Sequence, residues 1–143
     1  MTNRDVKKIL VPLDGSKNSL EGLDEAIFLA RCCNSTITAL CIIPSYPPLP
    51  LMGKQIPYEK HVLEHVKKFM STAKSTCVSN GIIFNEKIIK GVATLDISKF
   101  ASDNKFDLIV MGSRGMNPIK ELFLGSVSNA VVHKSKIPVL VVK

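Results

Sequence analysis

The stretch Met111–Asn129 reads M-G-S-R-G-M-N-P-I-K-E-L-F-L-G-S-V-S-N, and the interpretation of the whole chain starts from it. Its fixed points are Gly112, Gly115 and the pair Gly125-Ser126, which gives the spacing G-x2-G-x9-G-S. A strand, a glycine turn, a loop and a second glycine before a helix is an arrangement that holds phosphates, because glycine leaves main-chain N–H groups accessible. Ser126 stands where we expect the N-cap of a helix, whose positive end attracts anions. We therefore predict a phosphate site, and the alternative that these glycines only serve turns and caps stays open.

The composition limits the kinds of protein that this chain can be. Its 143 residues are 45% hydrophobic and 22% charged, as in ordinary globular proteins, and we expect one domain over residues 1–143. The formal net charge of +7 favours an acidic partner, but the lysines are scattered, so we do not expect nucleic acid. No membrane span, signal peptide or zinc spacing of the four cysteines is visible. We expect a cytoplasmic protein with reduced, mostly buried thiols.

Apolar runs and helical patterns alternate along the chain. Pro12 is placed at the end of the first strand, because proline cannot donate to a central ladder. Strands are expected at 9–13, 36–43, 82–89, 107–111 and 137–142. Helices are expected from a Ser16 cap to Asn34, from Tyr58 to Asn80, after a Thr94 cap, and from Val127 onward.

This alternation predicts a five-stranded parallel sheet with helices on both faces. Ligands of such sheets bind beyond the carboxyl ends of the strands, where the strand order reverses. The first and fourth strands both end in glycine turns, at Asp14-Gly15 and at Gly112–Gly115. A strand order of 3-2-1-4-5 places these two turns side by side at that point. Asp14 would then border the site, although Asp-Gly is also favourable turn chemistry by itself.

Three further segments accompany the glycine motif: K-I-L-V-P-L-D-G-S near the start, D-L-I-V-M-G-S-R-G before the glycine turn, and I-P-V-L-V-V near the end. Together they cover nearly the whole chain, which resembles the universal stress protein family. The motif G-x2-G-x9-G-[S/T] is found in the ATP-binding branch of that family and is lacking in the other branch. The resemblance implies a Rossmann-like fold of the adenine nucleotide alpha hydrolase type and an ATP-binding regulatory protein of the stress response that acts as a homodimer.

The candidate site has a phosphate end and an adenosine end, and its expected ligand is ATP or another adenine nucleotide. Mg²⁺ would accompany the phosphates, without a dedicated cage of carboxylates. We expect Gly112, Gly115 and Gly125 to let the backbone approach the phosphates, and Ser126 and Ser128 to donate their hydroxyls. Arg114 is expected to add positive charge, with a solvated loop residue as its alternative interpretation. The resemblance implies an adenosine end formed by Asp14, Ile42 and Val127, together with the neighbouring Pro12, Leu13 and Met111.

Enzymatic readings have less support in the sequence. The chain lacks the P-loop signature G-x4-G-K-[S/T], and no G-x-G-x-x-G follows the first strand. Only Asp14 and Glu121 could position a hydrolytic water near the motif. We therefore expect no catalytic residue and at most a slow ATPase. The alternative of another class is a dimeric protein-interaction module in which the glycine loop is structural and no nucleotide binds.

Two other features have a functional and a plain reading. His61 and His65 are four residues apart on a predicted helix, which would suit a metal, but no third ligand accompanies them and we interpret them as surface residues. The proline-rich segment 44–57 is predicted to be a connecting loop. A lid over the site, or a docking segment for a module that reads polyproline, are its alternatives.

The last predicted strand indicates how two copies would associate. Residues 137–142 are apolar on both faces, yet the strand order leaves them at the edge of the sheet. Antiparallel pairing of Pro138–Val142 with a second copy would satisfy both backbone and side chains. Members of the resembled family dimerise in this way. The signalling partner is not indicated by any motif.

Overall fold

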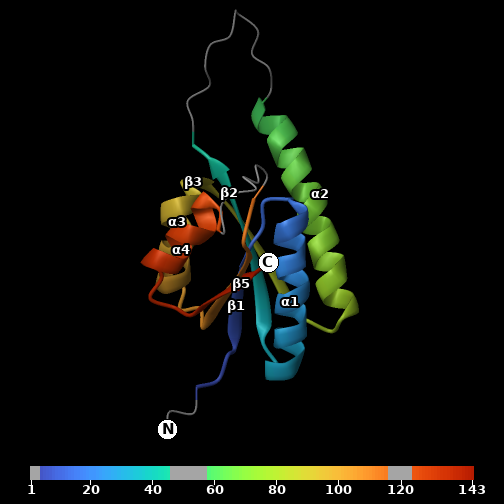
Figure 1. The fold of residues 1–143 in the computed structure, drawn as a ribbon. Helices are drawn as coiled ribbons and strands as arrows, with labels where there is room; N and C mark the ends of the chain where they lie inside the picture. The colour runs from blue at the N-terminus through green and yellow to red at the C-terminus, as the bar shows by residue number, and fades with distance from the viewer. Residues whose placement is uncertain (1–3, 46–57, 116–123) are drawn as a thin grey trace, which may run out of the picture.

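A computed structural model describes residues 4–45, 58–115 and 124–143 of the chain. Most of the proline-rich segment, and the residues between Gly115 and Leu124 with Glu121 among them, lie outside this part. Strands and helices alternate as expected (Figure 1). In chain order they are β1 (Lys8–Pro12), α1 (Lys17–Cys33), β2 (Thr36–Pro44), α2 (Tyr58–Ser79), β3 (Phe84–Gly91), α3 (Ala93–Asp103), β4 (Leu108–Gly112), α4 (Ser126–Lys134) and β5 (Val139–Val142).

The five strands form one parallel sheet in the order β3-β2-β1-β4-β5, which confirms the predicted fold class. Helices α1 and α2 cover one face of this sheet, and α3 and α4 cover the other (Figure 1). The chain crosses from β3 at one edge to β4 beyond β1, so the strand order reverses between β1 and β4. None of the described helices is long and apolar enough to cross a membrane.

Alternate residues of the strands fill the two layers of the core. On β1, Ile9 and Val11 pack with α1 and α2, whereas Leu10 packs with α3 and α4. All three side chains are fully buried. Burial of each aliphatic side chain of this size contributes about 1.5–3 kcal/mol to folding. The central strands β1 and β4 are thus held from both faces, and their carboxyl ends form a fixed platform.

Helix α1 begins and ends as the sequence predicts. The side chain of Ser16 accepts a hydrogen bond from Ser19 N (3.1 Å), which makes Ser16 the N-cap. Asn34 ends the helix in the left-handed conformation, with φ 56°. Helix α2 likewise ends at the Asn80-Gly81 turn, where Gly81 has φ 73°. Short polar side chains and glycine supply these stops because they tolerate positive φ.

Helix α3 begins differently from the prediction, which placed its cap at Thr94. The cap is Val92, and Thr94 lies within the first turn. The reason is Asp96, whose carboxylate accepts a hydrogen bond from Val92 N (2.6 Å) and so satisfies a donor that precedes the helix. In this helix Leu95 is 53% exposed, whereas Ile97 and Ala101 are buried.

Two strands begin two residues later than predicted. β3 begins at Phe84, because Ile82 still belongs to the turn after α2, where its N–H binds Cys77 O (2.9 Å). β5 begins at Val139, since Ile137 is held in a local turn by a hydrogen bond from its N–H to Ser135 Oγ (3.0 Å).

The cysteines also differ from expectation, which made them mostly buried. Cys41 and Cys77 are buried, and Cys32 and Cys33, the last two residues of α1, are exposed. All four are free thiols, as expected.

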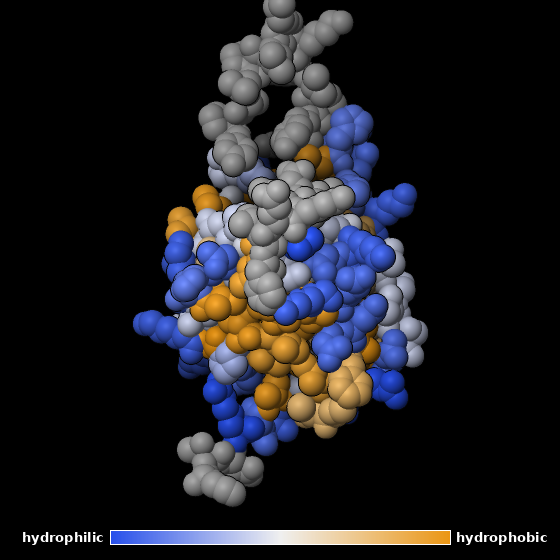
Figure 2. All heavy atoms as spheres, viewed as in Figure 1, coloured by the Kyte–Doolittle hydropathy of each residue, from blue (hydrophilic) through white to orange (hydrophobic). Residues whose placement is uncertain are grey.

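The outer edge of β5 is apolar. Leu140 is 36% exposed, and the other three residues of the strand are half-buried valines. Figure 2 shows a hydrophobic area on the face of the molecule where Figure 1 draws β5, flanked by α1 and α4. Among the described residues, β5 has a strand partner on the β4 side only. Its other side presents unpaired backbone groups next to apolar side chains, a combination that proteins normally cover.

Candidate functional site

The candidate site lies at the carboxyl ends of β1 and β4, where the strand order reverses. Pro12, the last residue of β1, is aligned with Leu40 of β2 and is buried, as is Leu13 after it. Leu13 N donates to Leu40 O (2.9 Å), which holds this segment on the sheet for one residue beyond the strand. Asp14 is the first exposed residue after β1. The predicted site residues 12–14 therefore consist of a buried floor followed by an accessible carboxylate.

The carboxylate of Asp14 is oriented by its own turn. Oδ1 accepts a hydrogen bond from Ser16 N (2.9 Å), and Gly15 between them has φ 83°, a conformation that favours glycine. The other oxygen faces the glycine loop, because a β-carbon at Gly115 would lie 2.7 Å from Asp14 Oδ2. The two turns that were expected to be neighbours are thus in direct proximity. Asp14 and Gly115 are both exposed there.

Gly112 lies against α1. A β-carbon at Gly112 would lie 2.5 Å from Asn18 O, and one at Gly22 would lie 2.9 Å from Gly112 N. Glycine at both positions therefore lets helix α1 pack closely on β4. The sequence reading assigned Gly112 to the approach of phosphate, but the residue is buried and its immediate neighbour is the helix. Its contribution to the site is to fix the distance between α1 and the loop.

Asn18 is a site residue that the sequence reading missed. Its Oδ1 accepts a hydrogen bond from Arg114 N (2.7 Å), and Ser113 Oγ lies 3.4 Å from the same oxygen. Its Nδ2 donates to Glu21 Oε2 (3.2 Å), which fixes the orientation of the amide. Asn18 thus ties the first turn of α1 to the start of the glycine loop. Its only signal in the sequence is a polar residue two positions after the N-cap, which does not reveal a partner 96 residues away.

The far end of the loop is tied to the same place. Gly125 N donates to Ser113 O (2.7 Å), and the buried Ser128 donates its hydroxyl to that oxygen as well (2.7 Å). The N-cap of α4 is Gly125, with φ −68° and ψ 167°, so the prediction of a cap at Ser126 is wrong by one residue. A β-carbon at Gly125 would lie 3.3 Å from Ser113 O, so a larger residue would crowd this closure.

The two serines of α4 therefore have different surroundings. Ser126 is exposed in the first turn of the helix, whose N–H groups have no carbonyl within the helix to bind. Ser128 is 2% exposed, and its hydroxyl points to Ser113 O and Gly125 O. We expected both hydroxyls to face phosphate, but that of Ser128 is engaged within the protein. Ser128 supports the loop from inside.

The remaining predicted residues line the side of α3 and α4. Met111 is buried, and Ile42 and Val127 are partly buried against the same hydrophobic cluster. Ile42 lies on β2 next to the edge strand β3, where it is aligned with Ile89. Ile42 on β2, Met111 on β4 and Val127 on α4 therefore belong to one hydrophobic cluster, although they come from three separate elements. Arg114 is half-buried at the start of the loop and has interactions of its own.

The described residues contain no group of three or more His, Cys, Asp and Glu side chains that could hold a metal. His61 and His65 are both exposed on α2, in agreement with their reading as surface residues. Burial, and secondarily the charge of Asp14, raises the pKa of the Cys41 thiol to about 11. Cys41 is therefore neutral at physiological pH and is not an activated nucleophile.

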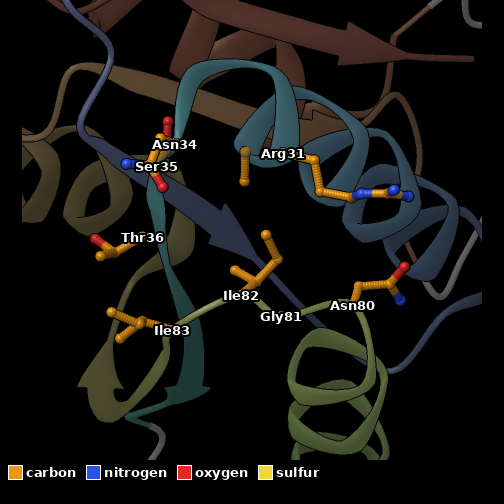
Figure 3. A pocket seen from close by; sticks show the side chains of 9 residues that line it. Arg31, Asn34, Ser35, Thr36, Asn80, Gly81, Ile82 and Ile83 are labelled. Carbon is orange, nitrogen blue, oxygen red and sulfur yellow. The ribbon is translucent and has the colours of Figure 1, made fainter.

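A hollow of about 400 Å³ lies elsewhere, between the C-terminal ends of α1 and α2. Figure 3 shows Ile82 between Ser35 and Thr36 at the start of β2 and Asn80 at the end of α2. This is the amino end of the sheet, opposite to the glycine loop. Arg31 is the only ionisable residue in its lining, and two helix C-termini with partial negative charge border it. These features do not form an anion site.

Comparisons with known proteins agree with this architecture over most of the chain. A family model described as "Universal stress protein family" matches residues 5–143. Universal stress protein MJ0531 of Methanocaldococcus jannaschii is 32% identical over 139 residues, which cover 96% of this chain and 82% of that protein. Universal stress protein YxiE of Bacillus subtilis is 30% identical, with 95% and 98% covered. The solved structure of MJ0577, a universal stress protein of M. jannaschii, superimposes with a TM-score of 0.86 at 30% identity, with 98% and 97% covered.

Two other solved structures share the fold at lower identity and contain nucleotides. One is a universal stress protein in complex with cAMP, with a TM-score of 0.75 and 22% identity, over 98% of this chain and 99% of that one. The other is the universal stress protein from Archaeoglobus fulgidus in complex with dAMP, with a TM-score of 0.72 and 22% identity, over 98% and 100%.

Proposed function

This chain belongs to the universal stress protein family, and from that premise we propose that it is a regulatory protein that binds adenine nucleotides, ATP in the first place, and acts as a homodimer. The observation that carries the proposal is the proximity of Asp14 and Gly115 at the point where the strand order reverses. Ligands of open α/β sheets bind at this point. Relatives of the same fold hold cAMP and dAMP, which supports an adenine nucleotide as the ligand class.

In this proposal the phosphates lie between the glycine loop and the start of α4. Gly115 leaves room for the ligand beside the backbone, and Ser126 and Val127 contribute N–H groups of the first helical turn, with the hydroxyl of Ser126 as a further donor. Arg114 adds positive charge at the start of the loop. The tie between Ser113, Gly125 and Ser128 keeps the two ends of the loop together. A preformed cradle of this kind loses little conformational entropy when the ligand binds.

The nucleoside lies on the β1 side in the same proposal. The carboxylate of Asp14 accepts hydrogen bonds from hydroxyl or amino groups of the ligand, above the buried floor of Pro12, Leu13 and Met111. Ile42 at the end of β2 and Val127 at the start of α4 border the base. Mg²⁺ travels with the phosphates, because the described residues offer no carboxylate cluster for it.

Binding rather than turnover is the proposed activity. Asp14 is the acidic residue of the described site that could orient a water, and its Oδ1 is already engaged with Ser16 N. We expect hydrolysis far below the ~1–10³ per second of typical enzymes. Phosphate release measured over hours with Asp14→Asn as the comparison checks this. A wild-type rate in the enzyme range that the substitution abolishes would make the protein an ATPase.

A second candidate function has an observation in its favour. Glycine at positions 112 and 125 is accounted for by internal packing against Asn18 and Ser113, as expected if the loop were structural in a dimeric interaction module. Gly115 separates the two candidates, because the atom nearest to its missing β-carbon is the end of an exposed side chain and not the backbone. A purely structural role of the loop therefore does not explain why residue 115 is a glycine.

Calorimetric titration with ATP·Mg²⁺, ADP and AMP tests the proposal. We expect saturable binding that weakens as phosphates are removed, and a rise in melting temperature, since ligand at 100 times Kd stabilises the folded state by about 2.7 kcal/mol. Gly115→Val should weaken binding with little change in the melting temperature of the free protein. Absence of both heat and melting shift at millimolar ATP would leave the interaction module as the function.

A further inference from the structure

Helix α2 reaches the candidate site through one histidine. A β-carbon at Gly15 would lie 3.3 Å from Nε2 of His65 and 2.8 Å from Cδ1 of Phe69, so both side chains cover this turn from the α2 side. The rings of His65 and Phe69 make an edge-to-face contact, with centroids 5.6 Å apart and an interplanar angle of 75°. Phe69 is buried in the core. The imidazole is therefore oriented by packing, although His65 as a whole is exposed.

The direction of α2 determines where this imidazole lies. The helix runs antiparallel to the strands, so its N-terminal half lies toward their carboxyl ends (Figure 1). His65 precedes Phe69 by one helical turn and is consequently nearer to the ligand edge than the core residue that orients it. The turn at Asp14-Gly15 thus faces the glycine loop on one side and His65 on the other.

A positive charge on the imidazole would favour an anionic ligand at this position. The carboxylate of Asp14 adds a negative charge to a site proposed to hold an anion, and a cation beside it would offset the repulsion. Histidine is the side chain that acquires such a charge between pH 8 and pH 5.

We propose that His65 is a ligand-binding residue of the nucleotide site and that its protonated imidazole, placed beside Asp14 across Gly15, strengthens the binding of the anionic nucleotide. The inference rests on the proposed function and adds a pH dependence to it. At pH 6 the wild-type protein should bind ATP more tightly than the same protein without this imidazole. At pH 8 the two proteins should bind ATP with equal affinity. The gain should be about 2- to 5-fold, the range of exposed charge pairs.

Other ionisable groups near this position do not produce the same dependence. On α2 itself the neighbours are His61, Glu64 and Lys68, one turn away or adjacent. On α1, Lys17 and Glu21 form an ion pair (3.9 Å) and carry opposite charges. Behind the turn, the Cys41 thiol has its pKa raised to about 11, with burial as the main cause, and stays neutral over this interval. Of these, only His61 is also an imidazole, and it is therefore the matched control.

The test compares ATP affinity in wild type, His65→Gln and His61→Gln at pH 6, 7 and 8. Because the terminal phosphate also titrates in this interval, the quantity of interest is the ratio of variant to wild-type Kd at each pH. We expect this ratio to be about 2 to 5 at pH 6 and near 1 at pH 8 for His65→Gln, and near 1 throughout for His61→Gln. Since His65 is exposed, the variant should retain the melting temperature of the wild type within a few degrees.

A second measurement uses the reciprocity of linked equilibria. Saturating ATP should move the NMR titration midpoint of His65 to higher pH and leave that of His61 unchanged. The inference is overturned, and nucleotide binding stands, if wild type binds ATP but the Kd ratio for His65→Gln is independent of pH and the NMR midpoint of His65 in the wild type does not move. If wild type binds no nucleotide at any of the three pH values, both the inference and the proposed function are overturned.

Discussion

The carboxylate of Asp14 faces Gly115 across the point where the strand order reverses, and a β-carbon on Gly115 would lie 2.7 Å from Asp14 Oδ2. Residues 101 positions apart in sequence meet there because β1 and β4 are adjacent parallel strands. The obstructing atom is the outer oxygen of an exposed carboxylate, which can shift at the cost of its hydrogen bond from Ser16 N. Gly115→Ala should therefore leave the melting temperature nearly unchanged and displace the carboxylate from its place beside the loop.

We expect Gly115→Ala to weaken ATP binding by about tenfold, which corresponds to 1.4 kcal/mol. Isothermal titration of wild type and variant measures this, and thermal melting shows that both are folded. Equal affinity in the two proteins would indicate that the ligand does not use the space between Gly115 and Asp14.

Gly112→Ala is the complementary substitution, because the atom that a β-carbon would meet is backbone. Asn18 O would lie 2.5 Å away, and helix α1 would have to move. Overpacking in a core costs about 1–3 kcal/mol, so the midpoint of urea unfolding should fall clearly below that of wild type and of Gly115→Ala. A urea midpoint equal to that of Gly115→Ala would contradict the close packing of α1 on β4.

Ser128 and Ser126 provide a second matched pair. Ser128→Ala removes a buried hydroxyl that donates to Ser113 O, which should cost about 1 kcal/mol of stability, and it loosens the tie between the ends of the glycine loop. Ser126→Ala removes an exposed hydroxyl and should leave stability within about 0.5 kcal/mol of wild type. Urea titrations of both variants measure the difference. A larger loss in Ser126→Ala would reverse the roles that the structure gives them.

The sequence determines the fold here because each local signal agrees with the next. Strand-turn-helix alternation, the Ser16 cap and the Asn34 stop all predict the same elements, and all occur in the structure. Two of the errors lie at element ends that depend on a single side chain. Asp96 moves the start of α3 to Val92, and Ser135 holds Ile137 outside β5. Propensity and spacing do not register such individual hydrogen bonds.

The candidate site was predictable to the level of the loop, and less so for individual atoms. Spacing identifies the glycines, but it does not show that Gly112 packs on α1 while Gly115 faces a carboxylate. Nor does it show that the hydroxyl of Ser128 points inward, or that Asn18 accepts the N–H of Arg114. These distinctions depend on which helix covers which end of β4, and that is a tertiary property.

The buried thiols predict a dependence of stability on alkaline pH. Burial, followed by the charge of Asp24, raises the pKa of Cys77 from 9.0 to about 11. A thiol whose pKa is higher in the folded state contributes stability below pH 9.0, and this contribution is lost as the pH rises toward about 11. The difference in unfolding free energy between wild type and Cys77→Ala should therefore shrink between pH 8 and pH 10.5. A difference that stays constant over this interval would contradict the assignment.

The last prediction concerns the proposed homodimer. The outer side of β5 presents unpaired backbone groups, with Leu140 36% exposed and Val141 half-buried. Figure 2 shows a hydrophobic area on the face where Figure 1 draws β5. Antiparallel pairing with β5 of a second copy, about a two-fold axis, would satisfy both the backbone and these side chains. Pro138 does not interfere, since it precedes the strand and its carbonyl already accepts from Ile109 N (3.0 Å).

Val141→Asp places a charge in this seam and should yield a monomer that still binds ATP, because Val141 is not among the residues proposed to contact the nucleotide. Leu140→Asp, at the more exposed position, tests the same seam with less risk to the fold. Light scattering at tens of micromolar measures the mass, and titration with ATP measures the site. Wild-type protein that scatters as a monomer would refute the pairing, as would dimers that persist in both variants. Loss of ATP binding in folded monomers of both variants would instead show that the site needs the second copy.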